Sequence, residues 1–180
     1  MRALRRTLDP AWIEAASAAV QARALALPVF AGAATVGCYL AASGEVQTGA
    51  VVEACRRAGK TVAVPAWREA TGGYALARFD AEARMKAGAM GILEPESPGW
   101  VDRVELFFAP GVAFDAEGGR LGHGAGHIDR MLAGIGAGLV TVGLAFDCQI
   151  VRRVPMGRND VRMDVVVTET RTFGRLAAGG

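Results

Sequence analysis

The chain contains little histidine or cysteine, with 2 His and 3 Cys among 180 residues. Cys38, Cys55 and Cys148 lie far apart and form no Cys-x-x-Cys pair. A disulfide framework or a zinc ribbon is therefore not expected, and Cys38 and Cys55 are predicted to be small core residues. This use of cysteine favours a protein of the reducing cytoplasm.

The net charge is also small. The chain has 20 Lys and Arg and 18 Asp and Glu, which gives a net charge of +2. The basic residues are scattered, so the sequence predicts neither a nucleic-acid partner nor binding to an anionic membrane. Residues 24–44 carry no charge, but Pro28, Gly32 and Gly37 interrupt them. We expect a helix end, a turn and a buried strand there instead of a membrane span, and a soluble protein.

Hydrophobic residues make up 52% of the chain, and its length is sufficient for one domain over residues 1–180 with a sizeable core. Segments typical of helices alternate with short apolar segments typical of strands, which favours an α/β layer fold with a mostly parallel sheet. The stretch between the strands at 74–79 and 91–93 is polar and helix-like. Helices are predicted at 10–27, 48–58 and 127–135, and strands at 35–41, 61–64, 74–79, 91–93, 104–109, 139–145 and 165–168.

Four aspartates are predicted to have structural roles. Asp9 precedes Pro10 in the arrangement of an N-cap followed by proline at the first helical position. Asp115 is expected to cap the turn before the two glycines at 118 and 119. Asp160 and Asp164 are expected to satisfy backbone groups at the ends of a loop and a strand.

A glycine-rich segment follows the most apolar predicted strand, residues 104–109. From Arg120 to Asp129 it reads Arg-Leu-Gly-His-Gly-Ala-Gly-His-Ile-Asp. Glycines at alternate positions let backbone N–H groups approach an anion, and a helix beginning near His127 adds positive potential. An arginine binds phosphate oxygens and an aspartate binds magnesium, so the segment predicts a polyphosphate site.

Other interpretations of this segment remain open. It is neither a Walker loop nor the dinucleotide fingerprint, and it could be a flexible turn between strand and helix. His123 and His127 are four residues apart, but they lie in a predicted loop and the chain has no third histidine for a zinc site. A titrating His127 could instead act in proton transfer near neutral pH.

Several ordered motifs make the chain similar to one known family. Residues 110–115 match Pro-Gly-x-x-Phe-Asp, and residues 120–129 match Arg-Leu-Gly-x-Gly-x-Gly-Tyr-Tyr-Asp except at the paired tyrosines. Together these motifs resemble the 5-formyltetrahydrofolate cyclo-ligase family, also called methenyltetrahydrofolate synthetase. Further matches, spread over nearly the whole chain, are Leu4-Arg5, Gly91-Ile92, Glu94-Pro95, residues 143–146, Val154-Pro155, Asn159-Asp160 and residues 166–169.

The resemblance implies a three-layer α/β/α fold with a mostly parallel sheet, similar to the isomerase/CoA-transferase-like fold. It also implies a ligase that converts 5-formyltetrahydrofolate to 5,10-methenyltetrahydrofolate with ATP and Mg²⁺. In that reaction the formyl oxygen attacks the γ-phosphate, N10 closes the ring and phosphate leaves. The implied partner is the reduced folate substrate, and the chain is expected to be a monomer or a weak homo-oligomer.

The resemblance also assigns roles to residues of this chain. Arg120 is the implied catalytic residue, and Asp129 is the implied Mg²⁺ ligand. His127 is predicted as a second catalytic residue for the reason given above, since the family has tyrosine at this position. The implied folate-binding residues are Leu40, Glu45 and Met90. The implied ATP-binding residues are Arg5, Arg120, Leu121, Gly122, His123, Gly124, Ala125, Gly126 and Ile128.

The chain departs from the family pattern at a few of these positions. His127 and Ile128 replace the paired tyrosines, and Met1 falls where the family has a lysine. A diverged relative that binds nucleotide or a folate-like ligand, with weak or no ligase activity, is therefore a second hypothesis. A sugar-phosphate isomerase or acyl-CoA-dependent transferase is a third, supported only by analogy of fold.

Overall fold

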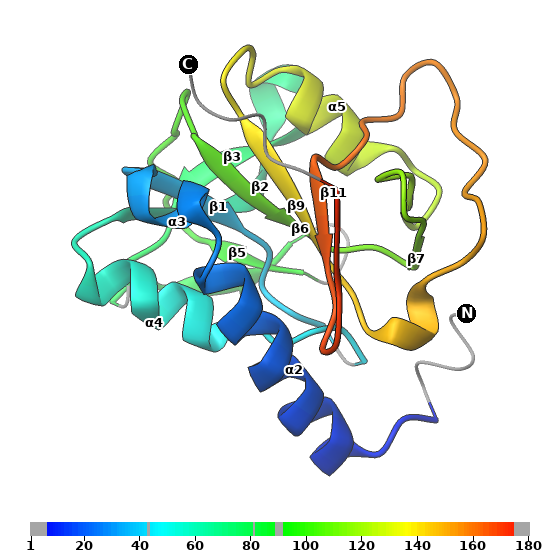
Figure 1. Ribbon diagram of the computed structural model, residues 1–180. Coiled ribbons are helices and arrows are strands. Elements are labelled where there is room, and N and C mark those ends of the chain that lie inside the picture. The colour runs from blue at the N-terminus through cyan, green and yellow to red at the C-terminus, as the bar shows by residue number, and fades with distance from the viewer. Residues whose placement is uncertain (1–6, 43, 81, 89–91, 175–180) are drawn as a thin grey trace.

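A computed structural model of the chain describes residues 7–42, 44–80, 82–88 and 92–174. Its centre is a seven-stranded sheet of order β11-β10-β9-β6-β1-β2-β3 (Figure 1). These strands are β1 (Thr35–Cys38), β2 (Thr61–Arg68), β3 (Gly73–Arg78), β6 (Leu106–Ala109), β9 (Val140–Leu144), β10 (Val165–Val167) and β11 (Thr172–Gly174). The helices are α2 (Pro10–Leu25), α3 (Pro28–Gly32), α4 (Gly49–Arg57) and α5 (His127–Ala133), with 3₁₀ turns η1 (Glu69–Thr71) and η2 (Asp147–Gln149). Two hairpins stand apart from the sheet, β4 (Met85–Ala87) with β5 (Leu93–Pro95), and β7 (Ala113–Phe114) with β8 (Arg120–Leu121).

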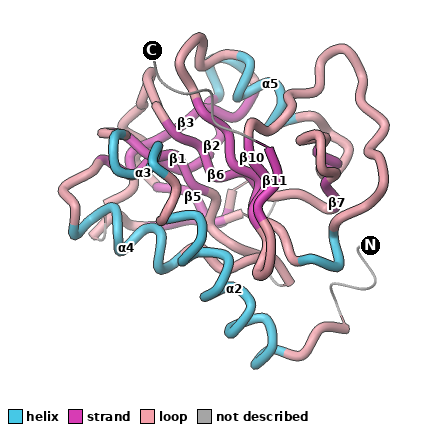
Figure 2. The backbone as a smooth tube through the Cα atoms, viewed as in Figure 1, coloured by secondary structure: helices cyan, strands magenta, loops and turns pink. Residues whose placement is uncertain are grey.

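The five inner strands β10, β9, β6, β1 and β2 run parallel, and the edge strands β3 and β11 are antiparallel to their neighbours. Helices α2, α3 and α4 cover one face of the sheet and α5 covers the other, with the strands as the middle layer (Figure 2). The predicted α/β fold with a mostly parallel sheet is confirmed.

Strand β6 lies at the centre of the sheet and is buried on both faces. Leu106 and Phe108 belong to the core beneath α2 and α4, whereas Phe107 and Ala109 belong to the core beneath α5. Successive side chains of a strand point to opposite faces, so an uninterrupted apolar run is what a doubly covered strand requires. This is why the strand was recognisable in the sequence.

The N-terminal helix begins as predicted but ends earlier. Asp9 Oδ1 accepts a hydrogen bond from Ala11 N at 3.3 Å, and Pro10 is the first helical residue. The predicted end at residue 27 is wrong, because α2 ends at Leu25 and Pro28 opens the separate helix α3. Proline fits that first position because the N–H it lacks has no partner there.

Strand β2 is longer than predicted. It continues through Pro65 to Arg68 instead of ending at residue 64. The pairing of β2 with β1 ends at Ala63, and beyond that point β2 pairs only with β3. Proline is tolerated where a strand has a neighbour on one side only, because its missing N–H can face the unpaired side.

The polar stretch after β3 was predicted to be helical, and this prediction is wrong. The chain forms the β4–β5 hairpin instead. Glu94 is buried in this hairpin, and its Oε2 accepts a hydrogen bond from Trp67 N of β2 at 2.8 Å. A contact to a residue 27 positions away overrides the local preference of the sequence.

The cysteines behave as core residues in the way that the sequence predicted. Cys38 and Cys55 are free and buried. Burial raises the pKa of the Cys38 thiol to about 12 and that of the Cys55 thiol to about 11, so both stay protonated at neutral pH. Over the ranges that the structure covers, no helix is both long enough and apolar enough to cross a membrane.

Candidate active site

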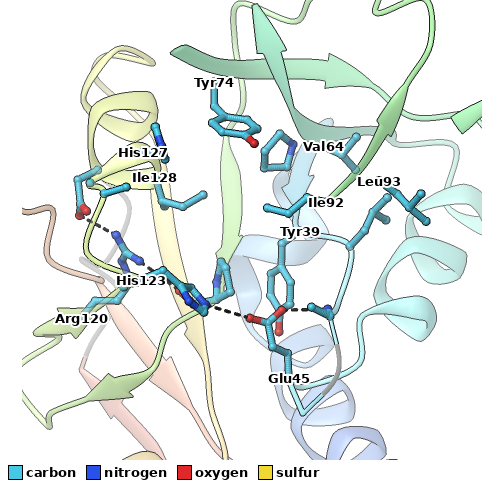
Figure 3. A pocket seen from close by; sticks show the side chains of 18 residues that line it. Tyr39, Glu45, Val64, Tyr74, Ile92, Leu93, Arg120, His123, His127 and Ile128 are labelled. Carbon is cyan, nitrogen blue, oxygen red and sulfur yellow. Dashed lines mark hydrogen bonds and ion pairs between the residues drawn. The ribbon is translucent and has the colours of Figure 1, made fainter. Parts of the chain in front are cut away.

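A cavity of about 380 Å³ opens at the carboxyl ends of β1 and β6, beside Val64 and Pro65 in the middle of β2 (Figure 3). This is the edge of a parallel sheet at which ligands are expected to bind. One side, which we call the apolar wall, consists of Val64, Pro65, Tyr74, Ile92 and Leu93. The other side, which we call the glycine-loop wall, consists of Pro110, Arg120, Gly122, His123, Ala125, Gly126, His127, Ile128 and Asp129. Tyr39, Leu40, Ala42 and Glu45, from the segment between β1 and α4, complete the lining.

Asp115 fixes the turn from which the glycine-loop wall starts. Its Oδ1 accepts hydrogen bonds from Gly119 N at 2.7 Å and Glu117 N at 3.1 Å, and its Oδ2 accepts one from Val154 N at 2.7 Å. Burial by itself would raise the pKa of Asp115, but these N–H donors outweigh it and lower the pKa below its ordinary value. The predicted capping role of Asp115 is confirmed.

Arg120 lies beneath the glycine loop, and its side chain is only 2% exposed. Its Nη2 donates to Asp129 Oδ1 at 2.7 Å, and its Nη1 donates to Pro110 O at 3.3 Å. Nε of Arg120 is buried and has no hydrogen-bond partner in the part of the chain that the structure describes. A Cβ at Gly122 would lie 3.0 Å from Nη1, so the loop packs closely over the guanidinium.

Asp129, the predicted magnesium ligand, is paired with Arg120 in this structure. Its Oδ1 also accepts a hydrogen bond from Val161 N at 3.1 Å. Within residues 7–174, apart from the few undescribed positions, no group of three or more His, Cys, Asp or Glu side chains gathers where it could hold a metal ion. The magnesium role of Asp129 stays a prediction, and neither histidine of the loop belongs to such a group.

The glycine loop passes into α5 at the predicted residue. Gly124 and Gly126 have φ angles of 100° and 63°, a region that favours glycine, and His127 is the first residue of the helix. The backbone of the loop therefore favours glycine at these two positions.

Glu45 brings the other side of the cavity mouth towards the glycine loop. It is buried, its Oε2 accepts a hydrogen bond from Ala42 N at 3.1 Å, and its Oε1 lies 3.8 Å from His123 Nε2 (Figure 3). A predicted folate residue and a predicted ATP residue therefore face each other across the mouth. Leu40 lines the cavity beside them. Of the remaining predicted site residues, Arg5 and Met90 lie outside the described residues.

Three residues around His127 were not predicted as part of the site. Its ring makes edge contacts with Tyr74, at 5.3 Å between ring centres, and with Trp67, at 6.2 Å. Arg130 Nη2 lies 3.0 Å from His127 Nδ1. The contact with Arg130 could have been predicted, because residues three apart on a helix are neighbours. Trp67 and Tyr74 are distant from His127 in the sequence, so no local spacing indicates their contacts with it.

Comparisons with known proteins indicate one family. The model of the 5-formyltetrahydrofolate cyclo-ligase family matches residues 1–169. The chain is 30% identical to a protein of Escherichia coli K12 named 5-formyltetrahydrofolate cyclo-ligase, over 96% of this chain and 98% of that protein. It is 31% identical to a protein of the same name from Haemophilus influenzae, over 93% of each chain.

A solved structure leads to the same family. The NMR structure of 5,10-methenyltetrahydrofolate synthetase from Aquifex aeolicus superposes with a TM-score of 0.82 and 30% sequence identity, covering 97% of this chain and 91% of that one. Sequence and structure thus agree over almost the full length of the chain, and it belongs to the 5-formyltetrahydrofolate cyclo-ligase family.

Proposed function

We propose that this protein is a ring-closing C–N ligase that converts 5-formyltetrahydrofolate to 5,10-methenyltetrahydrofolate with ATP. Membership of the family and the names of its relatives support this activity. No comparison favours the alternative of a relative without ligase activity. The reducing cytoplasm remains the predicted compartment, supported by the three free cysteines.

The proposed reaction consists of a phosphoryl transfer followed by ring closure. The formyl oxygen attacks the γ-phosphorus of ATP, the bond to ADP breaks, and an iminium phosphate forms at N5. N10 then adds to the former formyl carbon and loses its proton, and phosphate departs as the methenyl bridge forms. Such chemistry depends mainly on the positioning of the reactants and the neutralisation of phosphate charge.

One observation carries the assignment of the phosphates to the glycine loop. Arg120 lies beneath the loop and lines the cavity, although most of its side chain is buried. Its guanidinium therefore provides positive charge and N–H donors at the position where a phosphate group at the loop would bind. We infer that the N–H groups of Gly122, Gly124 and Gly126 bind the same phosphates, beside Leu121, His123, Ala125 and Ile128.

Asp129 is suited to hold Mg²⁺ through one oxygen only. Oδ1 accepts hydrogen bonds from Arg120 and Val161, which leaves Oδ2 as the oxygen for the metal. Mg²⁺ commonly takes one or two protein carboxylates and completes its shell with phosphate oxygens and water, so a single carboxylate oxygen fits it. When bound, the ion neutralises charge on the phosphates.

The folate is proposed to bind between Glu45 and the apolar wall. A carboxylate accepts two donors at once, which matches the polar edge of a pterin, and Leu40 and the apolar wall suit its aromatic rings. Arg5 for the phosphates and Met90 for the folate remain predictions. A part for His127 in proton transfer is also a prediction.

The activity is tested by mixing the protein with 5-formyltetrahydrofolate and MgATP and following the near-ultraviolet absorbance of the methenyl product. We expect a signal that requires ATP and that falls at least about a hundredfold in Arg120→Ala. Arg103→Ala, at an exposed position, is the matched control and should retain full activity. Thermal unfolding must show that Arg120→Ala is folded. ATP binding by wild type without any product would favour the non-catalytic relative.

A further inference from the structure

Arg130 is the exposed cation beside the glycine loop. Arg120 is buried, and Asp129 at 2.7 Å balances its charge. Arg130 is exposed, and none of the described carboxylates lies within 4.0 Å of its guanidinium. An anion that approaches the loop from solvent therefore meets the charge of Arg130 before that of Arg120.

The guanidinium of Arg130 spans the end of the loop. Nη2 is 3.0 Å from His127 Nδ1, and a Cβ built at Gly126 would lie 3.2 Å from Nη1. Arginine carries only donors, so His127 Nδ1 must be the acceptor, and the proton of the neutral ring is then on Nε2. One donor of Arg130 is used by His127, and its other N–H groups are available to a ligand at the loop.

The ring of His127 is held in a fixed orientation. Tyr74 lies beside it (Figure 3), and the ring planes of His127 and Tyr74 are 68° apart. Trp67 contacts the same ring at 85°, and both contacts have the edge-on arrangement that aromatic rings favour. This packing sets the direction of Nδ1, which in turn sets the position of the Arg130 guanidinium.

We propose that Arg130, held in place by His127, binds a phosphate group of ATP at the outer side of the glycine loop. The inference rests on the proposed function, because it needs a nucleotide at this loop. Arg130 provides a planar, permanently charged donor group from the solvent side, opposite the buried Arg120. His127 acts as a positioning residue for Arg130, a role distinct from proton transfer.

The simpler alternative is a contact between neighbouring side chains on a helix surface. Such a contact adds only slightly to helix stability and has no connection with a ligand. It would leave the affinity for ATP unchanged when either residue is replaced. Affinity for ATP therefore separates the two interpretations, whereas thermal stability does not.

The experiment is calorimetric titration of the full-length protein with MgATP in the absence of folate, so that no turnover occurs. We expect Arg130→Ala to bind ATP on the order of tenfold more weakly and Arg130→Lys to fall between it and wild type. Arg57→Ala is the matched control, because Arg57 is also exposed in the last turn of a helix. It should bind ATP like the wild-type protein.

Variants of His127 test its positioning role. His127→Phe keeps an aromatic ring beside Tyr74 and Trp67 but lacks the acceptor, whereas His127→Asn has an acceptor without the ring. We expect His127→Phe to weaken ATP binding and to have no further effect when Arg130 is already alanine. His127→Asn should retain more affinity than His127→Phe.

Three results would overturn the inference. One is a folded Arg130→Ala protein with unchanged ATP affinity. Another is an Arg130→Ala protein whose affinity for 5-formyltetrahydrofolate falls as much as its affinity for ATP. The third is His127→Phe with the ATP affinity of wild type, which would remove the positioning role. If the wild-type protein binds no ATP, the proposed function fails as well, which distinguishes that failure from the other three.

Discussion

The two walls of the cavity are built in different ways. The glycine-loop wall comes from one continuous segment and is held by hydrogen bonds and by the buried pair of Arg120 and Asp129. The apolar wall is assembled from β2, β3 and the β4–β5 hairpin, and the hydrogen bond from Trp67 N to Glu94 ties the hairpin to the sheet. A polar wall made from one segment can be recognised as a motif, whereas an apolar wall made from several segments depends on the fold.

The strongest test of this comparison removes the charge that balances Arg120. Asp129→Ala leaves the guanidinium buried and unpaired, and we expect it to lower the free energy of unfolding by about 3–5 kcal/mol. Asp80→Ala is the matched control, since it breaks the exposed pair of Arg78 and Asp80 at 3.2 Å and should change stability by less than about 1 kcal/mol. Urea unfolding measures both. Similar losses in the two variants would contradict the special contribution of the buried pair.

A second test concerns Asp115 and its dependence on pH. Its pKa is lowered in the folded state, so its ionised form stabilises the protein above the unfolded pKa, and this stability is lost as pH falls through the folded pKa. Asp115→Asn places an N–H₂ group against backbone donors, and we expect a loss of about 2 kcal/mol at pH 7. The difference in free energy of unfolding between variant and wild type should become smaller below about pH 4. If this difference in free energy of unfolding were constant from pH 3 to pH 7, the role of the ionised form would be contradicted.

The smallest expected effect on stability lies on the other side of the cavity. Glu94→Ala removes the acceptor for Trp67 N, and we expect a loss of about 1 kcal/mol together with a higher KM for folate, because Ile92 and Leu93 are no longer held in place. ATP affinity should be unchanged. Glu96→Ala, at an exposed position two residues further on, is the control. Equal losses of folate and ATP affinity would show that the two walls are not independent.

The sequence could predict the sheet and the glycine-loop wall because both depend on local patterns. The apolar run at residues 104–109 predicts the strand β6. The glycines at 118 and 119 after Asp115 predict a turn. The β4–β5 hairpin could not be predicted, because it depends on the contact between Glu94 and Trp67. The pairing of Arg120 with Asp129 was not predicted either. The sequence analysis assigned Arg120 to phosphate and Asp129 to Mg²⁺, and it did not consider a contact between the two residues.

The position of β6 has a further consequence for how the site is supported. This strand is hydrogen-bonded to β1 on one side and to β9 on the other, and its four residues are fully buried. Its amide hydrogens can exchange with solvent only when most of the domain opens, so they should be among the slowest in the protein. The loop that begins at Pro110 therefore starts from the part of the chain that local unfolding reaches last, and its own opening can occur while its point of attachment stays folded.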